Sequence, residues 1–142
     1  MTATTAPRTS RARAAALTAS IVALTLVTGA IHLSLGGMMF TLNALGYFAL
    51  AAAFVVGAAI SHPLVVRFSW VPRVALIGYA AFSIVAWLVM GGYYMLAYVT
   101  KGVEVALIGL LIVDIYRVYG GPTGLVRQAI ASIRWAVTLI RG

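Results

Sequence analysis

Residues 14–35 read AAALTASIVALTLVTGAIHLSL, and none of them is Asp, Glu, Lys or Arg. A helix needs about 20 predominantly apolar residues to cross the hydrocarbon core of a bilayer. The run is long enough for one crossing, and the chain carries no Asp, Glu, Lys or Arg until Arg67. The stretch therefore predicts a membrane-spanning helix rather than a helix of a soluble core.

The whole chain has the composition of a membrane protein. Apolar residues fill 63% of its 142 positions and charged residues 8%, whereas an average soluble domain is about 45–50% apolar. The length allows one small domain, so any function is expected in or on the bilayer. The chain has no cysteine, which excludes disulfides, thiolate nucleophiles and Cys-ligated zinc or iron–sulfur sites.

Three further apolar segments follow the first one, and together they predict an all-α bundle of four transmembrane helices. Gly36-Gly37 separates the first two segments, and residues 61–73, with two prolines and a tryptophan, form an interfacial loop before the third. Three tyrosines in residues 91–98 mark the next interface. The four predicted spans cover about residues 14–35, 39–60, 73–90 and 98–119.

The first span has a second interpretation, because RTSRAR followed by an apolar run also resembles a signal peptide. The apolar run is longer than the 7–15 residues of a signal-peptide core, and no convincing A-x-A cleavage site closes it. A retained span is therefore expected, preceded by a basic segment at residues 1–13.

The arginines collect on one side of the predicted bundle, and only Lys101 lies on the other side. The positive-inside rule then predicts a multi-pass protein of the cell membrane with both termini in the cytoplasm, N-in/C-in. Since topology accounts for the net charge of +8, no nucleic-acid partner is expected. The arginines are Arg8, Arg11, Arg13, Arg67, Arg73, Arg117, Arg127, Arg134 and Arg141.

Residues 123–142 predict a separate amphipathic helix on the cytoplasmic side. Arg127, Arg134 and Arg141 recur every seven residues and share one basic stripe. A helix of this kind lies in the membrane interface with its arginines toward anionic lipid headgroups, although its apolar side could also dock on a partner subunit. The apolar residues on the other side are Val126, Ile130, Ile133, Val137 and Ile140.

The segment TKGVEVALIGLLIVDIYR, residues 100–117, holds both acidic residues of the chain, Glu104 and Asp114. Lys101 and Arg117 each stand three residues from one of these acids, so each acid has a base within reach on its own helix. The acids are about 15 Å apart along the helix. The segment therefore predicts an outer Lys101–Glu104 pair and an inner Asp114–Arg117 pair, without a proton relay along the apolar stretch between them.

Four polar residues are expected at a similar depth near the outer face: His32, Asn43, Lys101 and Glu104. They could satisfy one another and fix the register of the helices, as polar residues do in membrane bundles. They could instead form a site for a ligand, an ion or a proton, with the tyrosines of residues 93–98 above them. The sequence leaves both interpretations open.

No catalytic motif or metal site is indicated by the sequence. G-x-S-x-G, H-E-x-x-H, Walker A and G-x-G-x-x-G are all missing. His32 and His62 are expected at opposite faces of the bilayer, so one haem cannot use both, and a His-only metal site fails for the same reason. No cofactor is predicted, with haem ligation by His32 alone left open.

Three short segments carry a resemblance: residues 29–36 (GAIHLSLG), 42–47 (LNALGY) and 98–107 (YVTKGVEVAL). They resemble segments of small four-span membrane proteins of prokaryotes, some of them archaeal, that have no assigned function. The resemblance spans about residues 20–118 and implies the four-span topology without any activity. The basic helix after it is not part of the resemblance.

The leading hypothesis from the sequence is a non-enzymatic accessory or scaffold subunit, in a larger membrane complex or a homo-oligomer. The uninterrupted spans and the missing catalytic motifs motivate it. One alternative is a small transporter or ion- or proton-conducting oligomer that uses Glu104 and His32, with Asp114 at the inner mouth. A second alternative is a redox or quinone-site anchor that uses His32 and the outer tyrosines.

Overall fold

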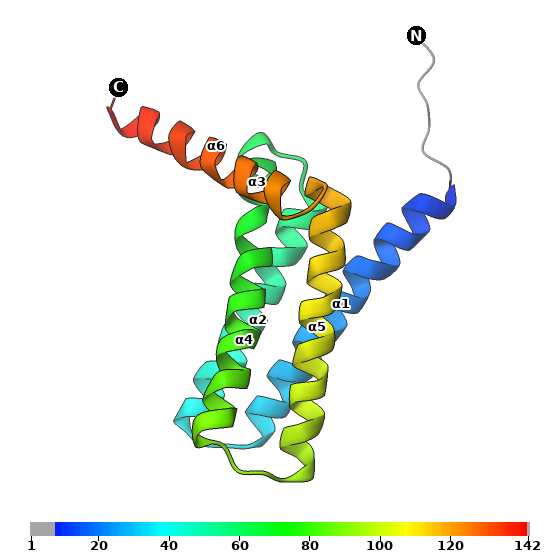
Figure 1. Ribbon diagram of the computed structural model, residues 1–142, viewed down its shortest axis with the longest axis vertical. Helices are drawn as coiled ribbons and strands as arrows, with labels where there is room; N and C mark the ends of the chain where they lie inside the picture. Colours follow the sequence, from blue (N-terminus) through cyan, green and yellow to red (C-terminus); the bar gives the residue numbers. More distant parts are fainter. Residues whose placement is uncertain (1–7, 142) are drawn as a thin grey trace.

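The computed structural model describes residues 8–141, and this part of the chain is helical with no strand. Four helical stretches within it are long and apolar enough to cross a membrane. The all-α prediction is confirmed, and the four apolar helices indicate a membrane protein. The helices are α1 (Arg8–Ser34), α2 (Met38–Ala59), α3 (Pro63–Phe68), α4 (Trp70–Met90), α5 (Met95–Tyr119) and α6 (Pro122–Arg141) (Figure 1).

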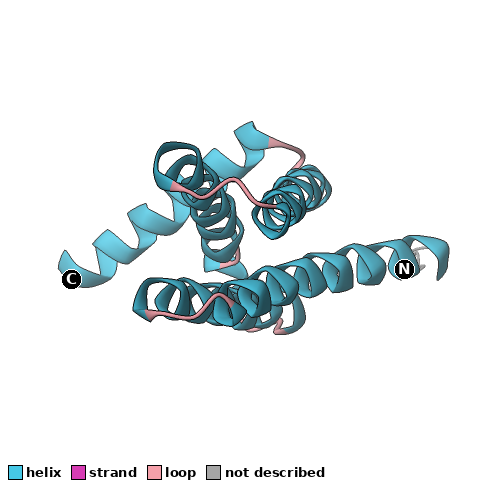
Figure 2. Cartoon of the chain, turned by 90° about the horizontal axis from the view of Figure 1, so that it is seen from below, coloured by secondary structure: helices cyan, strands magenta, loops and turns pink. Residues whose placement is uncertain are grey.

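The long helices form an up-and-down bundle in which α1 and α4 each pack against α2 and α5. The α1–α2 turn and the α4–α5 connection lie at one end, which we call the cavity end (Figure 2, seen from this end). The start of α4, the end of α5 and the whole of α6 lie at the opposite end, which we call the arginine end (Figure 1). The start of α1 and the end of α6 are both on the arginine-end side (Figure 1).

The first helix is longer than expected at its N-terminus. Residues 8–13, assigned from the sequence to a basic segment before the span, continue α1, and this part projects away from the bundle (Figure 1). Alanine and arginine are both strong helix formers, so the helix can begin several residues before the apolar run does. The remainder of the predicted N-terminal segment, residues 1–7, lies outside the described residues.

The predicted interfacial loop at residues 61–73 contains more helix than the sequence indicated. Pro63 begins the short helix α3, and the His62 side chain caps it by accepting a hydrogen bond from the backbone N–H of Leu64 at 3.3 Å. Proline suits the first turn of a helix because its missing N–H has no partner there in any case. Helix α4 then begins at Trp70, so Arg73 already lies in its first turn.

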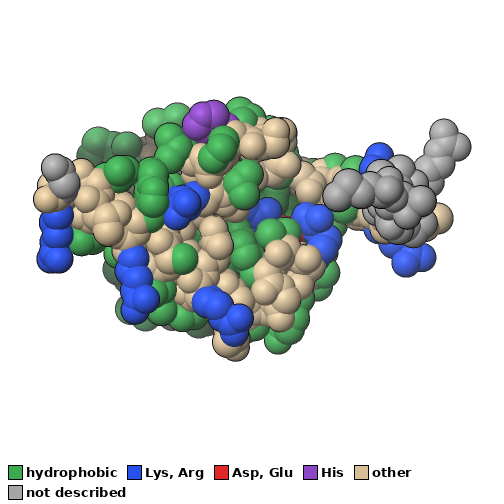
Figure 3. Space-filling model, turned by 90° about the horizontal axis from the view of Figure 1, so that it is seen from above, with side chains coloured by type: hydrophobic (Ala, Val, Ile, Leu, Met, Phe, Trp, Pro, Cys, Tyr) green, Lys and Arg blue, Asp and Glu red, His purple; other side chains and the backbone are tan. Residues whose placement is uncertain are grey.

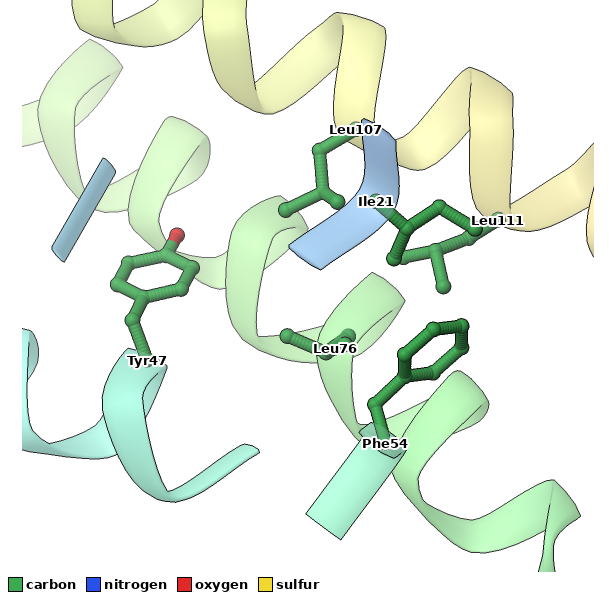
Figure 4. Packing of buried hydrophobic residues seen from close by; sticks show 6 residues of the cluster. All are labelled: Ile21, Tyr47, Phe54, Leu76, Leu107 and Leu111. Carbon is green, nitrogen blue, oxygen red and sulfur yellow. The ribbon is translucent and has the colours of Figure 1, made fainter. Parts of the chain in front are cut away.

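An apolar core fills the middle of the bundle between its two ends. Figure 4 shows side chains from α1, α2, α4 and α5 meeting there. Burial of large apolar side chains at such a junction provides the packing that holds membrane helices together. The fully buried members of the core are Ile21, Tyr47, Phe54, Leu76, Leu107 and Leu111.

Glycine serves two different purposes at the cavity end. Gly36 and Gly37 turn the chain between α1 and α2 with φ angles of 70° and 82°, which L-residues with side chains rarely adopt. Gly91 has an ordinary φ of −82°, but a Cβ there would collide with Trp87. The indole N–H of Trp87 donates to the carbonyl oxygen of Gly92 at 3.1 Å, so this second glycine pair lets an aromatic side chain close over the loop.

Helix α6 crosses the arginine end and docks through polar side chains (Figure 1). The side chains of Gln128 and Ser132 donate to the carbonyl oxygen of Arg67 at 3.1 and 2.8 Å, and the Arg67 guanidinium stacks 4.6 Å from the ring centre of Trp135. Basic side chains, coloured blue, gather on the face seen in Figure 3, where no Asp or Glu is visible. The five residues of the predicted apolar side of α6 are all exposed.

Candidate functional site

Both carboxylates lie on the bundle-facing stripe of α5, and both are 0% exposed. Residues three and four apart share one face of a helix, so Glu104 and Asp114 line up with Thr100, Leu107 and Leu111. A buried carboxylate is costly unless donors surround it. A single base on the same helix is therefore not enough, and each acid has partners on other helices.

Glu104 accepts hydrogen bonds from three helices. Its Oε1 receives the hydroxyls of Tyr47 on α2 and Ser83 on α4, both at 2.9 Å, and its Oε2 receives the Lys101 ammonium at 2.7 Å. The same ammonium also donates to the hydroxyl and the carbonyl oxygen of Ser83, at 2.7 and 3.2 Å. Three donors satisfy the oxygens of this one carboxylate, so the cluster is an ion pair with two hydroxyl partners.

His32 completes this cluster from α1. Its Nδ1 lies 2.8 Å from the carbonyl oxygen of Thr28, one turn earlier in the helix, and its Nε2 lies 3.9 Å from Oε1 of Glu104. The imidazole is 4% exposed, and its ring centre is 5.6 Å from that of Tyr47. We call His32, Tyr47, Ser83, Lys101 and Glu104 the Glu104 cluster.

Asn43, the fourth residue of the predicted outer cluster, does not take part through its side chain in any hydrogen bond seen within residues 8–141. Its backbone carbonyl accepts the Tyr79 hydroxyl at 3.2 Å. This approach depends on Gly46, because a Cβ at that position would collide with the Tyr79 hydroxyl. The structure therefore brings together three of the four predicted residues, and it places the fourth on the wall of an adjacent cavity.

A cavity of about 460 Å³ opens beside the Glu104 cluster at the cavity end. His32, Ser83 and Lys101 contribute its charged and hydroxyl-bearing floor, and no Asp or Glu is among its lining residues. Glu104 itself lies behind this floor, fully buried. The apolar and aromatic side chains of the wall come mainly from α2 and α4 and include Met39, Phe40, Leu42, Phe82, Trp87 and Met90.

Asp114 forms a second cluster at the arginine end, with two arginines. Its Oδ2 accepts from Nε of Arg73 at 2.7 Å, and its Oδ1 accepts from Nη2 and Nε of Arg117 at 2.6 and 3.0 Å. Arg73 also donates to the carbonyl oxygen of Ser69 at 2.6 Å. We call Asp114, Arg73 and Arg117 the Asp114 cluster, which joins α4 to α5 and carries one excess positive charge.

Reasoning from the sequence did not identify three of the partners: Tyr47, Ser83 and Arg73. Arg73 was counted among the arginines of the interface, but it is 2% exposed and stacks 5.2 Å from the ring centre of Phe54. Its position at the start of the predicted span 73–90 was the available signal, since an arginine inside a span is expected to face the bundle. A tyrosine or serine in a span carries a weaker signal, because both also occur at lipid-facing positions.

No three His, Asp or Glu side chains within residues 8–141 come close enough to hold a metal ion together. No protein-family model, curated protein or solved structure matches the chain. The resemblance to four-span prokaryotic membrane proteins therefore stays a prediction from the sequence.

Proposed function

We propose that this protein is an integral membrane binding protein for a small amphipathic molecule, held in the cavity beside the Glu104 cluster. One observation carries the proposal: an apolar cavity of about 460 Å³ ends on a polar floor of His32, Ser83 and Lys101. Small-molecule sites are typically apolar hollows in which a few polar groups orient the ligand. An amphipathic molecule matches this division, with its chain along the wall and its head group at the floor.

The rim of the cavity supports access from the bilayer. Met39, Phe82 and Met90 line the cavity and are also 75%, 71% and 78% exposed. In a membrane, apolar side chains with this exposure contact lipid tails. A lipophilic molecule dissolved in the bilayer can therefore reach the cavity without crossing water, which favours an amphiphile over a water-soluble ligand.

The side chains of the floor and the wall are held in place by contacts with one another. Lys101 uses all three of its ammonium hydrogens on Ser83 and Glu104. On the wall, the Trp87 ring packs edge-on against Tyr93 and Tyr98, at centroid distances of 5.3 and 5.2 Å. Binding to a preorganised site costs less conformational entropy, because the side chains are already held in place.

Two of the hypotheses drawn from the sequence find less support in these contacts. The uninterrupted apolar spans that motivated an accessory or scaffold subunit suit lipid as well as they suit another protein. A transporter or conducting pore needs polar groups along a path, but the buried α5 residues between Glu104 and Asp114 are Leu107 and Leu111. Neither hypothesis explains the cavity, which a binding function does.

For the membrane orientation, we propose that the arginine end faces the cytoplasm and that α6 rests against anionic lipid of that leaflet. The chain has no cysteine, so single cysteines can report topology. A membrane-impermeant thiol reagent added to whole cells should label Met38→Cys at the cavity end and leave Ser61→Cys unlabelled. The opposite labelling pattern would reverse the orientation.

Binding in the cavity can be followed with the fluorescence of Trp87. The double substitution Trp70→Phe/Trp135→Phe leaves Trp87 as the single tryptophan. This variant is measured in nanodiscs of zwitterionic lipid. The probes are bromine-tagged decyl amphiphiles with a sulfonate, a hydroxyl or a quaternary ammonium head, since bromine quenches nearby indole fluorescence. At least one of them should quench Trp87 in a saturable manner.

The control is a pair of alanine substitutions of equal size. Ala86→Phe places a ring in the cavity that Ala86 lines and should remove the saturable quenching. Ala52→Phe adds the same ring on an exposed position of α2 that does not line the cavity, and it should leave the quenching unchanged. Quenching that never saturates, or that is identical in both variants, would reflect dissolution in the bilayer and would refute the binding function.

A further inference from the structure

The hydrogen bond between His32 and Thr28 determines which imidazole nitrogen carries the hydrogen. Nδ1 of His32 lies 2.8 Å from the backbone oxygen of Thr28. A carbonyl oxygen only accepts hydrogen bonds, so Nδ1 must be the donor. In a neutral ring, Nε2 then has no hydrogen and presents a lone pair.

This lone pair faces a carboxylate. Nε2 of His32 lies 3.9 Å from Oε1 of Glu104, an oxygen that accepts hydrogen bonds from the hydroxyls of Tyr47 and Ser83. With a neutral ring, two hydrogen-bond acceptors therefore face each other in a buried place with no hydrogen between them, which is unfavourable. A proton on Nε2 converts the same geometry into an ion pair between imidazolium and carboxylate.

His32 contributes the one imidazole of this cluster. The charged and titratable groups around it are Glu104 and Lys101 from α5 and Tyr47 from α2, with Tyr79 of α4 in edge contact with Tyr47. Imidazole is the side chain that ordinarily changes charge between pH 5 and 8, whereas carboxyl, phenol and ammonium groups ordinarily do not. Proton uptake by the cluster is therefore assigned to Nε2 of His32.

Protonation would change the charge at the cavity floor. With a neutral His32, the charges of Lys101 and Glu104 cancel, but with imidazolium the cluster carries one excess positive charge. Both cations line the cavity while the carboxylate lies behind them. An uncompensated charge in an apolar membrane environment is unfavourable, and an anionic head group at the floor would compensate it.

We propose that the cavity binds an amphiphile with a single negative charge and that each binding event places one proton on Nε2 of His32. The proposal rests on the proposed binding function and adds the ligand class and its coupling to protons. Linkage is reciprocal, so the anion favours the proton as much as the proton favours the anion. A neutral amphiphile of the same length gains nothing from protonation and should bind independently of pH.

Calorimetric titrations of the protein in zwitterionic nanodiscs test this directly. Decanesulfonate stays anionic at every pH used, so any proton taken up must go to the protein, and decanol is the neutral probe. Between pH 8 and 6, the affinity for decanesulfonate should rise by up to about tenfold per pH unit, as uptake of one proton requires. Buffers of different ionisation enthalpy should report a proton uptake that approaches one per bound anion at the upper pH.

The matched variant is His32→Asn, because the asparagine amide can still donate to the Thr28 carbonyl and lacks an equivalent of Nε2. Its affinity for decanesulfonate should fall at pH 6 by the parent's whole gain between pH 8 and 6, which is up to about a hundredfold, and should lose its pH dependence, while its affinity for decanol stays unchanged. Equal affinity of the parent protein for both probes without proton uptake would overturn the proposal, as would pH dependence retained in the variant. Saturable decanol binding would in both cases leave the binding function intact, whereas no saturable binding of any probe would refute that function.

Discussion

The two carboxylates of this protein have the same burial and very different partners. Glu104 and Asp114 lie on one stripe of α5, and each is 0% exposed. Asp114 is neutralised by two guanidinium groups, which keep their charge at any physiological pH. Glu104 is neutralised by one ammonium and two hydroxyls, with an imidazole within 3.9 Å.

This difference separates a structural cluster from one that can respond. The Asp114 cluster has a fixed charge and fastens α4 to α5 through the hydrogen bond of 2.7 Å from Arg73 to Asp114. The Glu104 cluster includes a group that can gain a proton, and it borders the cavity. Burial of an acid alone does not indicate a functional site in this molecule. The two clusters differ in the bases beside the acid, which are arginines at one and a lysine with a histidine at the other, and only the Glu104 cluster borders the cavity.

The largest effect is expected from Asp114→Asn, which removes the negative charge and keeps the size of the side chain. Arg73 is 2% exposed, and without its carboxylate it becomes an unpaired buried charge. Breaking a buried pair in this way costs about 3–5 kcal/mol. The free energy of unfolding, measured by titrating detergent micelles with SDS, should fall by that amount.

Arg117→Gln provides the control at the same cluster. The Arg117 side chain is 39% exposed, so solvent and headgroups screen its charge, and its loss should cost less than about 1 kcal/mol. If Asp114→Asn cost no more than this control, the assignment of the Arg73–Asp114 pair as a structural fastening would be contradicted.

A smaller loss is expected from Glu104→Gln. The amide oxygen can still accept from Tyr47 and Ser83, and Lys101 keeps both of its contacts with Ser83 beside an open cavity. The free energy of unfolding should therefore fall by about 1–2 kcal/mol, which is less than for Asp114→Asn in the same titration. Equal losses in the two variants would mean that the two clusters do not differ in the way their partners suggest.

The smallest effect, and one of opposite sign, is expected from Thr28→Val. Among the described residues, the Thr28 hydroxyl is the one buried side-chain polar group without a hydrogen-bond partner. Its replacement by a methyl group should stabilise the protein by about 1 kcal/mol, and the carbonyl that holds His32 remains. The matched control is Thr25→Val, which removes a hydroxyl that does donate, to the carbonyl oxygen of Ile21 at 2.7 Å, and should not stabilise.

Part of each cluster could be predicted from the sequence. Each acid has a base three residues away on α5, a spacing that brings side chains together on any helix. In the structure Nζ of Lys101 lies 2.7 Å from Oε2 of Glu104, and Nη2 of Arg117 lies 2.6 Å from Oδ1 of Asp114. Contacts between helices depend on how each helix is rotated about its axis. The sequence placed His32 at the depth of Glu104, but the contribution of Tyr47 required the tertiary structure.

The sequence by itself determined the class of the protein and the number of its apolar spans. Charge-free runs such as residues 14–35 are long enough to cross a bilayer as helices, which satisfy their own backbone hydrogen bonds. The helix period then brings residues three and four apart onto one face. Only the tertiary structure decided which polar groups meet across the bundle, why Arg73 faces inward, and where a cavity remains. Those features arise from packing between segments distant in the chain, as where Gly46 lets Tyr79 approach α2, and local spacing carries no information about them.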